Sequence, residues 1–339
     1  MNFCAFFLMQ SIDPKRSFHE RISRALEQVH LIEEHGFHSI WLGEHHFSEY
    51  SPLSRPFQVA AFLAARTKKI RIGTAVALTP LYHPLNLAEE FNSLDQLSQG
   101  RTEIGLGRGY ENFIFDRFLQ KSEDIESKWS EQINILMRAF ANNEFEFHGK
   151  YYDFPKTVIT PTSFQSRKIP IWIATHSLKT ITPFPDTPIN ILTRGVCDID
   201  KISLLGKELS ELKTKNIRNQ IQSIGVQAMI YVAESKSDAI DAVELAKKVM
   251  HYTLSIRKNS SNNLTSEADI NNLVEKNLIE NSIIGSPEYC INKLKKLEES
   301  VGFTHLIGNF DYGGMSQART LNSIQKFSRQ VMPVRLQMV

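Results

Sequence analysis

Short, continuous apolar runs alternate with amphipathic segments along almost the whole chain. The apolar runs cover residues 2–9, 38–42, 70–78, 102–106, 170–174, 189–192, 226–233 and 304–310. Such runs are typical of parallel strands that are buried on both faces. The segments with helical spacing cover residues 17–35, 57–65, 84–97, 122–141, 202–221, 239–252, 287–300 and 316–331. About eight strands separated mostly by helices predict an α/β fold, a (β/α)₈ TIM barrel.

Two segments interrupt this alternation. Within 144–168, the sequences HGKYYDF and TVITPTS resemble two short strands, which predicts a small insertion outside the main sheet. Residues 257–272 are polar and include a run of asparagine and serine, which predicts a mobile surface segment. No shift in composition marks a boundary, so we expect a single domain over 1–339. A doubly wound nucleotide-binding sheet is the weaker alternative, because no G-x-G-x-x-G follows the first strand.

Composition narrows the class of protein. The 339 residues are 42% hydrophobic and 22% charged, and the net charge of +2 gives no signature of nucleic-acid binding. The three scattered cysteines, Cys4, Cys197 and Cys290, suit free thiols in a reducing compartment. The apolar N-terminus lacks the basic region of a signal peptide, and no apolar run reaches the ~18 residues of a membrane span. We therefore expect a cytoplasmic protein.

The stretch 37–50, FHSIWLGEHHFSEY, changes abruptly from apolar to polar after its strand. The change places Glu44, His45 and His46 at the carboxyl end of that strand, where barrels bind their ligands. One interpretation is catalysis, and the other is a hydrogen-bonded structural corner. Because adjacent strand residues point to opposite faces, at most one of the two histidines should face the cavity. No HExxH or CxxC spacing accompanies them, so a metal site is less expected.

Three further strand ends carry residues suited to a ligand. Arg108 lies in a glycine-rich turn and offers a planar fork to phosphate or carboxylate, although such a turn can also hold a solvated arginine. Residues 174–177, with Thr175, His176 and Ser177, can cradle a phosphate or simply cap a helix. Gly73 to Ala75 are small enough to admit a flat ring, unless barrel packing alone demands small residues. Together these ends would suit a planar aromatic ligand with a phosphate tail.

The chain resembles the bacterial luciferase-like flavin monooxygenases over nearly its whole length. The resemblance is carried by WLGEHHFSEY, RIGTAVALTPLYHPLNLAEEFNSLDQLSQGR, the GLGRGY turn and the closing THLIGNFDYGG and VMP. It implies a barrel that binds reduced FMN supplied by a separate flavin reductase, with O₂ adding to the flavin as a 4a-peroxide that oxygenates a small organic substrate. By this resemblance His45 is the catalytic base, Arg108 binds the FMN phosphate, Ala75 lies beside the isoalloxazine ring, and Tyr110 lies in the equivalent loop.

The chain also departs from that family. Gly107 replaces the reactive cysteine of luciferase, and Thr175-His176 replaces its Glu-Ser, so part of the phosphate site differs. The resemblance further implies a lid over 257–282 and a dimer, for which we expect a homodimer through 57–65 and 84–97. Neither the substrate nor light emission follows from it.

Two other functions stay open. One is a deazaflavin-dependent oxidoreductase on the same barrel, against which the EHHF pattern argues. The other is a non-catalytic flavin-binding or partner subunit. His45, Arg108 and the lid segment argue against that function, whereas the altered residues 175–188 argue for it.

Overall fold

Eight parallel strand positions close a barrel in the part of the chain that the structure describes. The computed structural model describes residues 1–109, 112–120, 124–141, 144–166, 168–175, 188–193, 204, 207–208, 221–258 and 267–336. In ring order the strands are β1 (Asn2–Phe7), β2 (Ser39–Leu42), β3 (Arg71–Thr74) with β4 (Ala77–Leu78), β5 (Thr102–Gly107), β8 (Ile171–Ala174), β9 (Ile189–Leu192), β10 (Ile221–Val232) and β12 (His305–Asn309). Pairing of β12 with β1 closes the ring, which confirms the barrel prediction.

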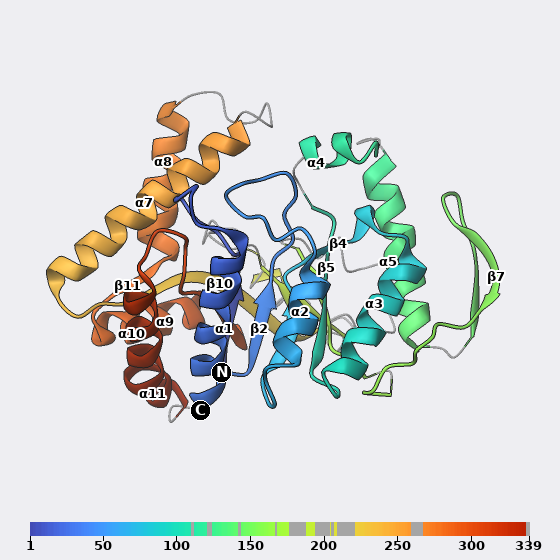
Figure 1. Ribbon diagram of the computed structural model, residues 1–339, viewed down its shortest axis with the longest axis horizontal. Helices are drawn as coiled ribbons and strands as arrows, with labels where there is room; N and C mark the ends of the chain where they lie inside the picture. Colours follow the sequence, from blue (N-terminus) through green and yellow to red (C-terminus); the bar gives the residue numbers. More distant parts are fainter. Residues whose placement is uncertain are drawn as a thin grey trace.

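Helices surround this barrel (Figure 1). They are α1 (Phe18–Glu34), α2 (Pro56–Ala64), α3 (Pro84–Leu97), α4 (Asn112–Arg117), α5 (Ile125–Ala141), α7 (Lys236–Lys258), α8 (Glu267–Asn281), α9 (Pro287–Val301), α10 (Gln317–Lys326) and α11 (Met332–Leu336). A 3₁₀ turn, η1 (Thr79–Leu81), precedes α3, and a π-helical segment, η6 (Phe327–Val331), joins α10 to α11. No helix in the described residues has the length and hydrophobicity needed to cross a membrane.

The helix ends follow from local sequence. Ser17 and Glu20 form a reciprocal capping box at the start of α1. At α9, the Ser286 side chain accepts a hydrogen bond from a backbone N–H and Pro287 occupies the first turn. Gly302 ends the same helix with φ 67°, a left-handed conformation that glycine adopts at little cost. These signals explain why the predicted boundaries of both helices are close to the observed ones.

Side chains fill the interior of the barrel, so it is a packed core. The inward-facing cluster consists of Cys4, Phe6, Trp41, Trp172, Leu192 and Ile307. The rings of Trp41 and Trp172 meet edge to face with centroids 5.3 Å apart. A Cβ atom on Gly73 would lie 2.5 Å from the Trp41 ring. Packing therefore demands glycine at position 73. Of the two interpretations of the small residues 73–75, barrel packing accounts for this position.

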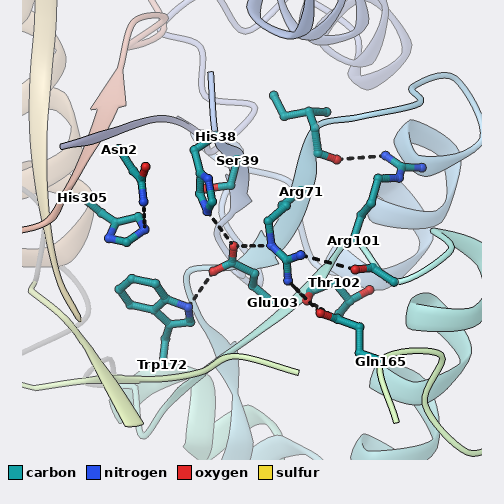
Figure 2. Close-up of polar contacts among 12 residues, drawn as sticks. Asn2, His38, Ser39, Arg71, Arg101, Thr102, Glu103, Gln165, Trp172 and His305 are labelled. Carbon is teal, nitrogen blue, oxygen red and sulfur yellow. Dashed lines mark hydrogen bonds and ion pairs between the residues drawn. The ribbon is translucent and has the colours of Figure 1, made fainter. Parts of the chain in front are cut away.

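A polar network closes the amino-terminal end of the barrel, with Glu103 at its centre (Figure 2). The buried Glu103 carboxylate accepts hydrogen bonds from Arg71 Nε at 2.8 Å and Trp172 Nε1 at 2.6 Å, and it lies 3.4 Å from His38 Nε2. Burial alone would raise the pKa of Glu103, but the His38 hydrogen bond and the Arg71 charge outweigh it and lower the pKa. Because this end lies opposite the ligand-binding end, we assign the network to stability.

Several predicted segments need correction. The strand predicted over 70–78 is broken into β3 and β4. The insertion does form a separate antiparallel sheet, β6 (Phe145–His148) with β7 (Asp153–Thr157), but HGKYYDF contains the turn and TVITPTS lies mostly beyond β7. Most of the helix predicted over 202–221 lies outside the described residues, and its last residue instead begins β10. A short strand that the sequence did not predict, β11 (Ile283–Gly285), pairs with β10.

The segment predicted to be a mobile surface segment is helical where the structure describes it. Helix α7 continues to Lys258 and α8 begins at Glu267, while residues 259–266 lie outside the described residues. Ile270, Val274 and Leu278 are buried at helical spacing in a cluster shared with α7. The sequence therefore did not predict α8, because its apolar stripe is sparse within a polar segment.

Candidate active site

The residues that the sequence singled out gather at the carboxyl ends of the parallel strands. In Figure 1 the β2 arrow points toward the end of the barrel where α4, α7 and α8 lie. Glu44 to His46 follow β2, and Ala75 follows β3. Arg108 follows β5 and Thr175 follows β8. The barrel therefore brings all four segments to one mouth, whereas Tyr110, His176 and Ser177 lie outside the described residues.

Glu44 links the residues after β2 to β4 and to Tyr82, which follows η1. Its Oε1 lies 2.7 Å from Nε2 of His46 and accepts a hydrogen bond from the Tyr82 hydroxyl at 3.0 Å. Its Oε2 accepts a hydrogen bond from the backbone N–H of Leu78 at 2.8 Å. Both Glu44 and His46 are buried. A buried carboxylate with three partners anchors the segment that leads from Ala75 into α3.

Burial and the neighbouring Glu44 carboxylate raise the pKa of Tyr82 above its ordinary value. The Tyr82 hydroxyl therefore stays protonated at neutral pH and acts as a donor to Glu44. Nothing in the sequence pointed directly to this contact, because Tyr82 lies 38 residues from Glu44 along the chain.

The two histidines are in different environments. His46 is 4% exposed and packs edge to face on the Phe118 ring, with centroids 5.1 Å apart. His45 is half-buried, and its backbone N–H donates to the carbonyl of Leu53 at 2.9 Å. The structural-corner interpretation thus describes the Glu44–His46 pair and leaves His45 as the more accessible imidazole at the mouth.

Small side chains form a shelf beside the interior cluster. Ala75 and Val76 are half-buried and pack against that cluster, as does Ala174. The backbone N–H of Ala75 donates to the Leu42 carbonyl at 2.8 Å, which ties the shelf to β2. The peptide bond between Ala75 and Val76 is cis. We interpret these residues as a surface against which a flat ring can lie.

Val76 also explains why position 107 holds glycine. A Cβ atom on Gly107 would lie only 2.3 Å from Cγ2 of Val76. The Val76 side chain therefore takes the space that a side chain at position 107 would need. The sequence shows the glycine but not its contact with Val76, since Val76 lies between β3 and β4 whereas Gly107 ends β5.

Arg108 extends from the mouth toward solvent. Its Nη1 lies 2.9 Å from Oε2 of Glu126, and the two side chains are 48% and 83% exposed. An ion pair this exposed contributes little to stability, so its carboxylate can be exchanged for a ligand anion. Thr175 is buried at the neighbouring strand end, where its backbone N–H donates to the Leu192 carbonyl at 3.0 Å. The described residues therefore fit a planar ring with a phosphate tail.

Comparison with known proteins agrees with this description. Residues 1–305 match the model of the luciferase-like monooxygenase family. An uncharacterised Sinorhizobium fredii protein, y4vJ, is 38% identical over 64% of the chain and 66% of its own length. The oxygenase component of a flavin-dependent trigonelline monooxygenase from Acinetobacter baylyi is 26% identical over 98% of the chain and 95% of its own length.

Solved structures share the fold. Monooxygenase RslO1 from Streptomyces bottropensis superposes with a TM-score of 0.83 at 21% identity, covering 99% of this chain and 100% of its own. The FMN complex of the oxygenating constituent of 3,6-diketocamphane monooxygenase from Pseudomonas putida superposes with a TM-score of 0.76 at 18% identity, covering 98% of each chain. A coenzyme F420-dependent tetrahydromethanopterin reductase from Methanopyrus kandleri superposes with a TM-score of 0.73 at 18% identity, covering 98% of this chain and 99% of its own.

The barrel and its mouth thus define a flavin-type oxidoreductase scaffold. The chain belongs to the luciferase-like monooxygenase family, which confirms the family resemblance and the class of flavin-dependent monooxygenase.

Proposed function

We propose that this protein is the oxygenase component of a two-component FMN-dependent monooxygenase. It would take reduced FMN from a separate flavin reductase and use O₂ to oxygenate a small organic substrate. The observation that carries the proposal is the placement of Arg108, the Ala75–Val76 shelf and the accessible His45 at one barrel mouth. The FMN and oxygenase-component descriptions of two of the similar proteins support it.

Each residue has a proposed task. Arg108 binds the FMN phosphate in place of Glu126, and Thr175 lies at the adjacent strand end beside the same phosphate. Ala75 and Val76 contact the ring. Tyr110, His176 and Ser177 are also predicted to bind the cofactor, and they lie outside the described residues.

Reduced FMN, when bound, supplies the electrons that activate O₂. His45 accepts a proton at its imidazole during oxygenation, because imidazole exchanges protons readily near neutral pH. Glu44 does not share this task, since its carboxylate is already engaged by His46, Tyr82 and the Leu78 backbone.

An anaerobic titration with reduced FMN tests the proposal against the deazaflavin alternative, which the shared fold of the F420-dependent reductase favours. We expect reduced FMN to bind at least tenfold more tightly than a reduced deazaflavin. Preferential binding of the deazaflavin, with substrate reduction that needs no O₂, would contradict the proposal.

Two further features belong to the proposal. Phe62 on α2 is 36% exposed and Leu97 on α3 is 64% exposed, which favours a homodimer through these helices. Sedimentation showing only monomer at micromolar concentration would contradict the homodimer.

The buried free thiols Cys4 and Cys290 favour a reducing compartment such as the cytoplasm. Burial raises the pKa of each thiol to about 12, so both stay protonated.

A further inference from the structure

A buried amide at the barrel mouth has an unsatisfied oxygen. Asn309, the last residue of β12, is 7% exposed, and its Oδ1 has no hydrogen-bond partner among the described residues. Most buried polar atoms in folded proteins are hydrogen-bonded, and leaving one unpaired is costly. An unpaired amide oxygen at a ligand-binding end is therefore a candidate for contact with a ligand.

The alternation along β12 shows which way Asn309 points. Ile307 belongs to the inward-facing cluster. A Cβ atom on Gly308 would lie 2.7 Å from both Ile230 and Phe310, which belong to the outer core between the strands and helices. Because strand residues alternate between faces, Asn309 lies on the same inward face as Ile307. It is the residue of β12 nearest the mouth on that face.

A second amide lies on the neighbouring strand. A Cβ atom on Gly225 of β10 would contact the inward-facing Ile307 and Leu192, so Gln227, two residues further on, faces inward too. The register pairs Gln227 with Ile307 and Met229 with Asn309. Gln227 is half-buried. The two amides are thus diagonal neighbours on adjacent parallel strands.

The surroundings of Asn309 are apolar. The pairing of Ala5 with Gly308 places the inward-facing Phe6 of β1 beside Asn309, and Leu8 packs against the same cluster. In the closed ring β12 is separated from β5, which leads to Arg108, by three strand positions in either direction. The amide pair therefore lies across the barrel from the proposed phosphate site, on the wall left for a substrate.

Neutral amides favour particular ligands. Each carboxamide offers one acceptor oxygen and two N–H donors and carries no charge. A plain hydrocarbon would leave the Asn309 oxygen unpaired, and a carboxylate would gain no positive charge from either amide.

We propose that Asn309, assisted by Gln227, selects the substrate of this site. The substrate class is a compact, mainly apolar compound with a neutral hydrogen-bonding group that includes an N–H or O–H, such as a carboxamide or lactam. This inference rests on the proposed function in one respect, since it takes the wall opposite Arg108 as the substrate side.

Binding of three matched one-ring probes tests the inference: benzamide, benzoate and toluene. Dissociation constants are measured by ligand-detected NMR, with and without oxidised FMN. We expect wild-type protein to bind benzamide about tenfold more tightly than either other probe, which is the value of roughly one hydrogen bond. Asn309→Leu should bring the dissociation constant of benzamide to within threefold of that of toluene. Gln227→Leu should reduce the preference for benzamide by a smaller factor. No preference in wild type, or its persistence in Asn309→Leu, would overturn the inference.

Thermal stability separates recognition from a structural role. Asn309→Leu removes an unpaired buried oxygen, so its unfolding midpoint should stay unchanged or rise. Asn190→Leu is the matched control, because Asn190 faces the interior from β9 and its Nδ2 donates to the Ile171 carbonyl at 3.2 Å. The control should lower the midpoint and keep the benzamide preference. A comparable fall in the unfolding midpoint of Asn309→Leu would show that Asn309 has a structural role. Since no reduction or O₂ is involved, these outcomes do not depend on those that test the monooxygenase.

Discussion

The Glu44 carboxylate and the His46 imidazole form a buried pair, with Oε1 and Nε2 separated by 2.7 Å. The pair lies directly beside His45 in the sequence, yet it leaves that imidazole half-buried at the mouth. One acidic residue therefore holds the strand end in place through the histidine two residues further on.

Glu44→Ala should destabilise the protein by about 3–5 kcal/mol, because it leaves the His46 ring, the Tyr82 hydroxyl and the Leu78 N–H without their acceptor. The free energy of unfolding from urea denaturation measures this. Asp153→Ala is the matched control, since Asp153 pairs with His148 at 3.2 Å on an exposed hairpin, and it should cost under about 1 kcal/mol. Equal losses in the two variants would contradict the anchoring role.

Replacing the two histidines should have different effects on turnover and on stability. His45→Ala is expected to lose about 10²–10⁴-fold in turnover, the usual contribution of a general base, while stability and FMN affinity stay near wild type. His46→Ala should instead lower stability, because it removes a buried partner of Glu44. Product formed per reduced FMN and the urea midpoint are measured for both variants. A His45→Ala yield within a few-fold of wild type would refute the assignment.

Arg108→Ala should weaken FMN binding by about one to two decades and leave riboflavin binding unchanged, because only FMN carries the phosphate. Glu126→Gln should strengthen FMN binding a few-fold, since the Glu126 carboxylate competes for the same guanidinium. Equilibrium titrations with both flavins measure these effects. Equal weakening of FMN and riboflavin in Arg108→Ala would show that Arg108 does not contact the phosphate.

Gly107→Ala should reduce both stability and flavin affinity, because the new Cβ meets the Val76 side chain. Val76→Ala in the same chain should restore much of the loss by removing the atoms that clash. A double-mutant cycle measured by thermal unfolding and by FMN titration gives the coupling energy, expected at about 1–2 kcal/mol. Additive effects would mean that the two positions do not share this space.

The sequence was sufficient to predict the barrel because each strand is a continuous apolar run and each capped helix has its own signals, as at Ser286 and Gly302. The alternation of faces predicted that at most one of His45 and His46 faces the cavity, and the structure buries His46 while His45 is half-buried. The sequence could not show that Glu44 contacts Tyr82 and Leu78, or that Val76 excludes a side chain at position 107, because those contacts depend on packing between distant segments.

Stability should fall as the pH drops from about 6.5 to about 4. Burial lowers the pKa of His305 to about 4, so in this range the unfolded chain binds a proton that the folded chain does not. The loss amounts to about 3 kcal/mol in total. The lowered pKa of Glu103 adds a further loss below its ordinary titration range. Urea midpoints at several pH values should show a shallower slope above pH 4 in His305→Gln. An unchanged slope would contradict this assignment.

The reaction of the FMN-loaded protein with O₂ tests the central claim most directly. Protein is mixed anaerobically with reduced FMN and then with O₂ in a stopped-flow spectrometer, with Arg108→Ala at the same flavin concentration as the control for binding. We expect wild type to show a transient absorbance that differs from both reduced and oxidised FMN, and Arg108→Ala to lose most of its amplitude. Reoxidation of wild type in one step at the rate of free flavin would contradict the account.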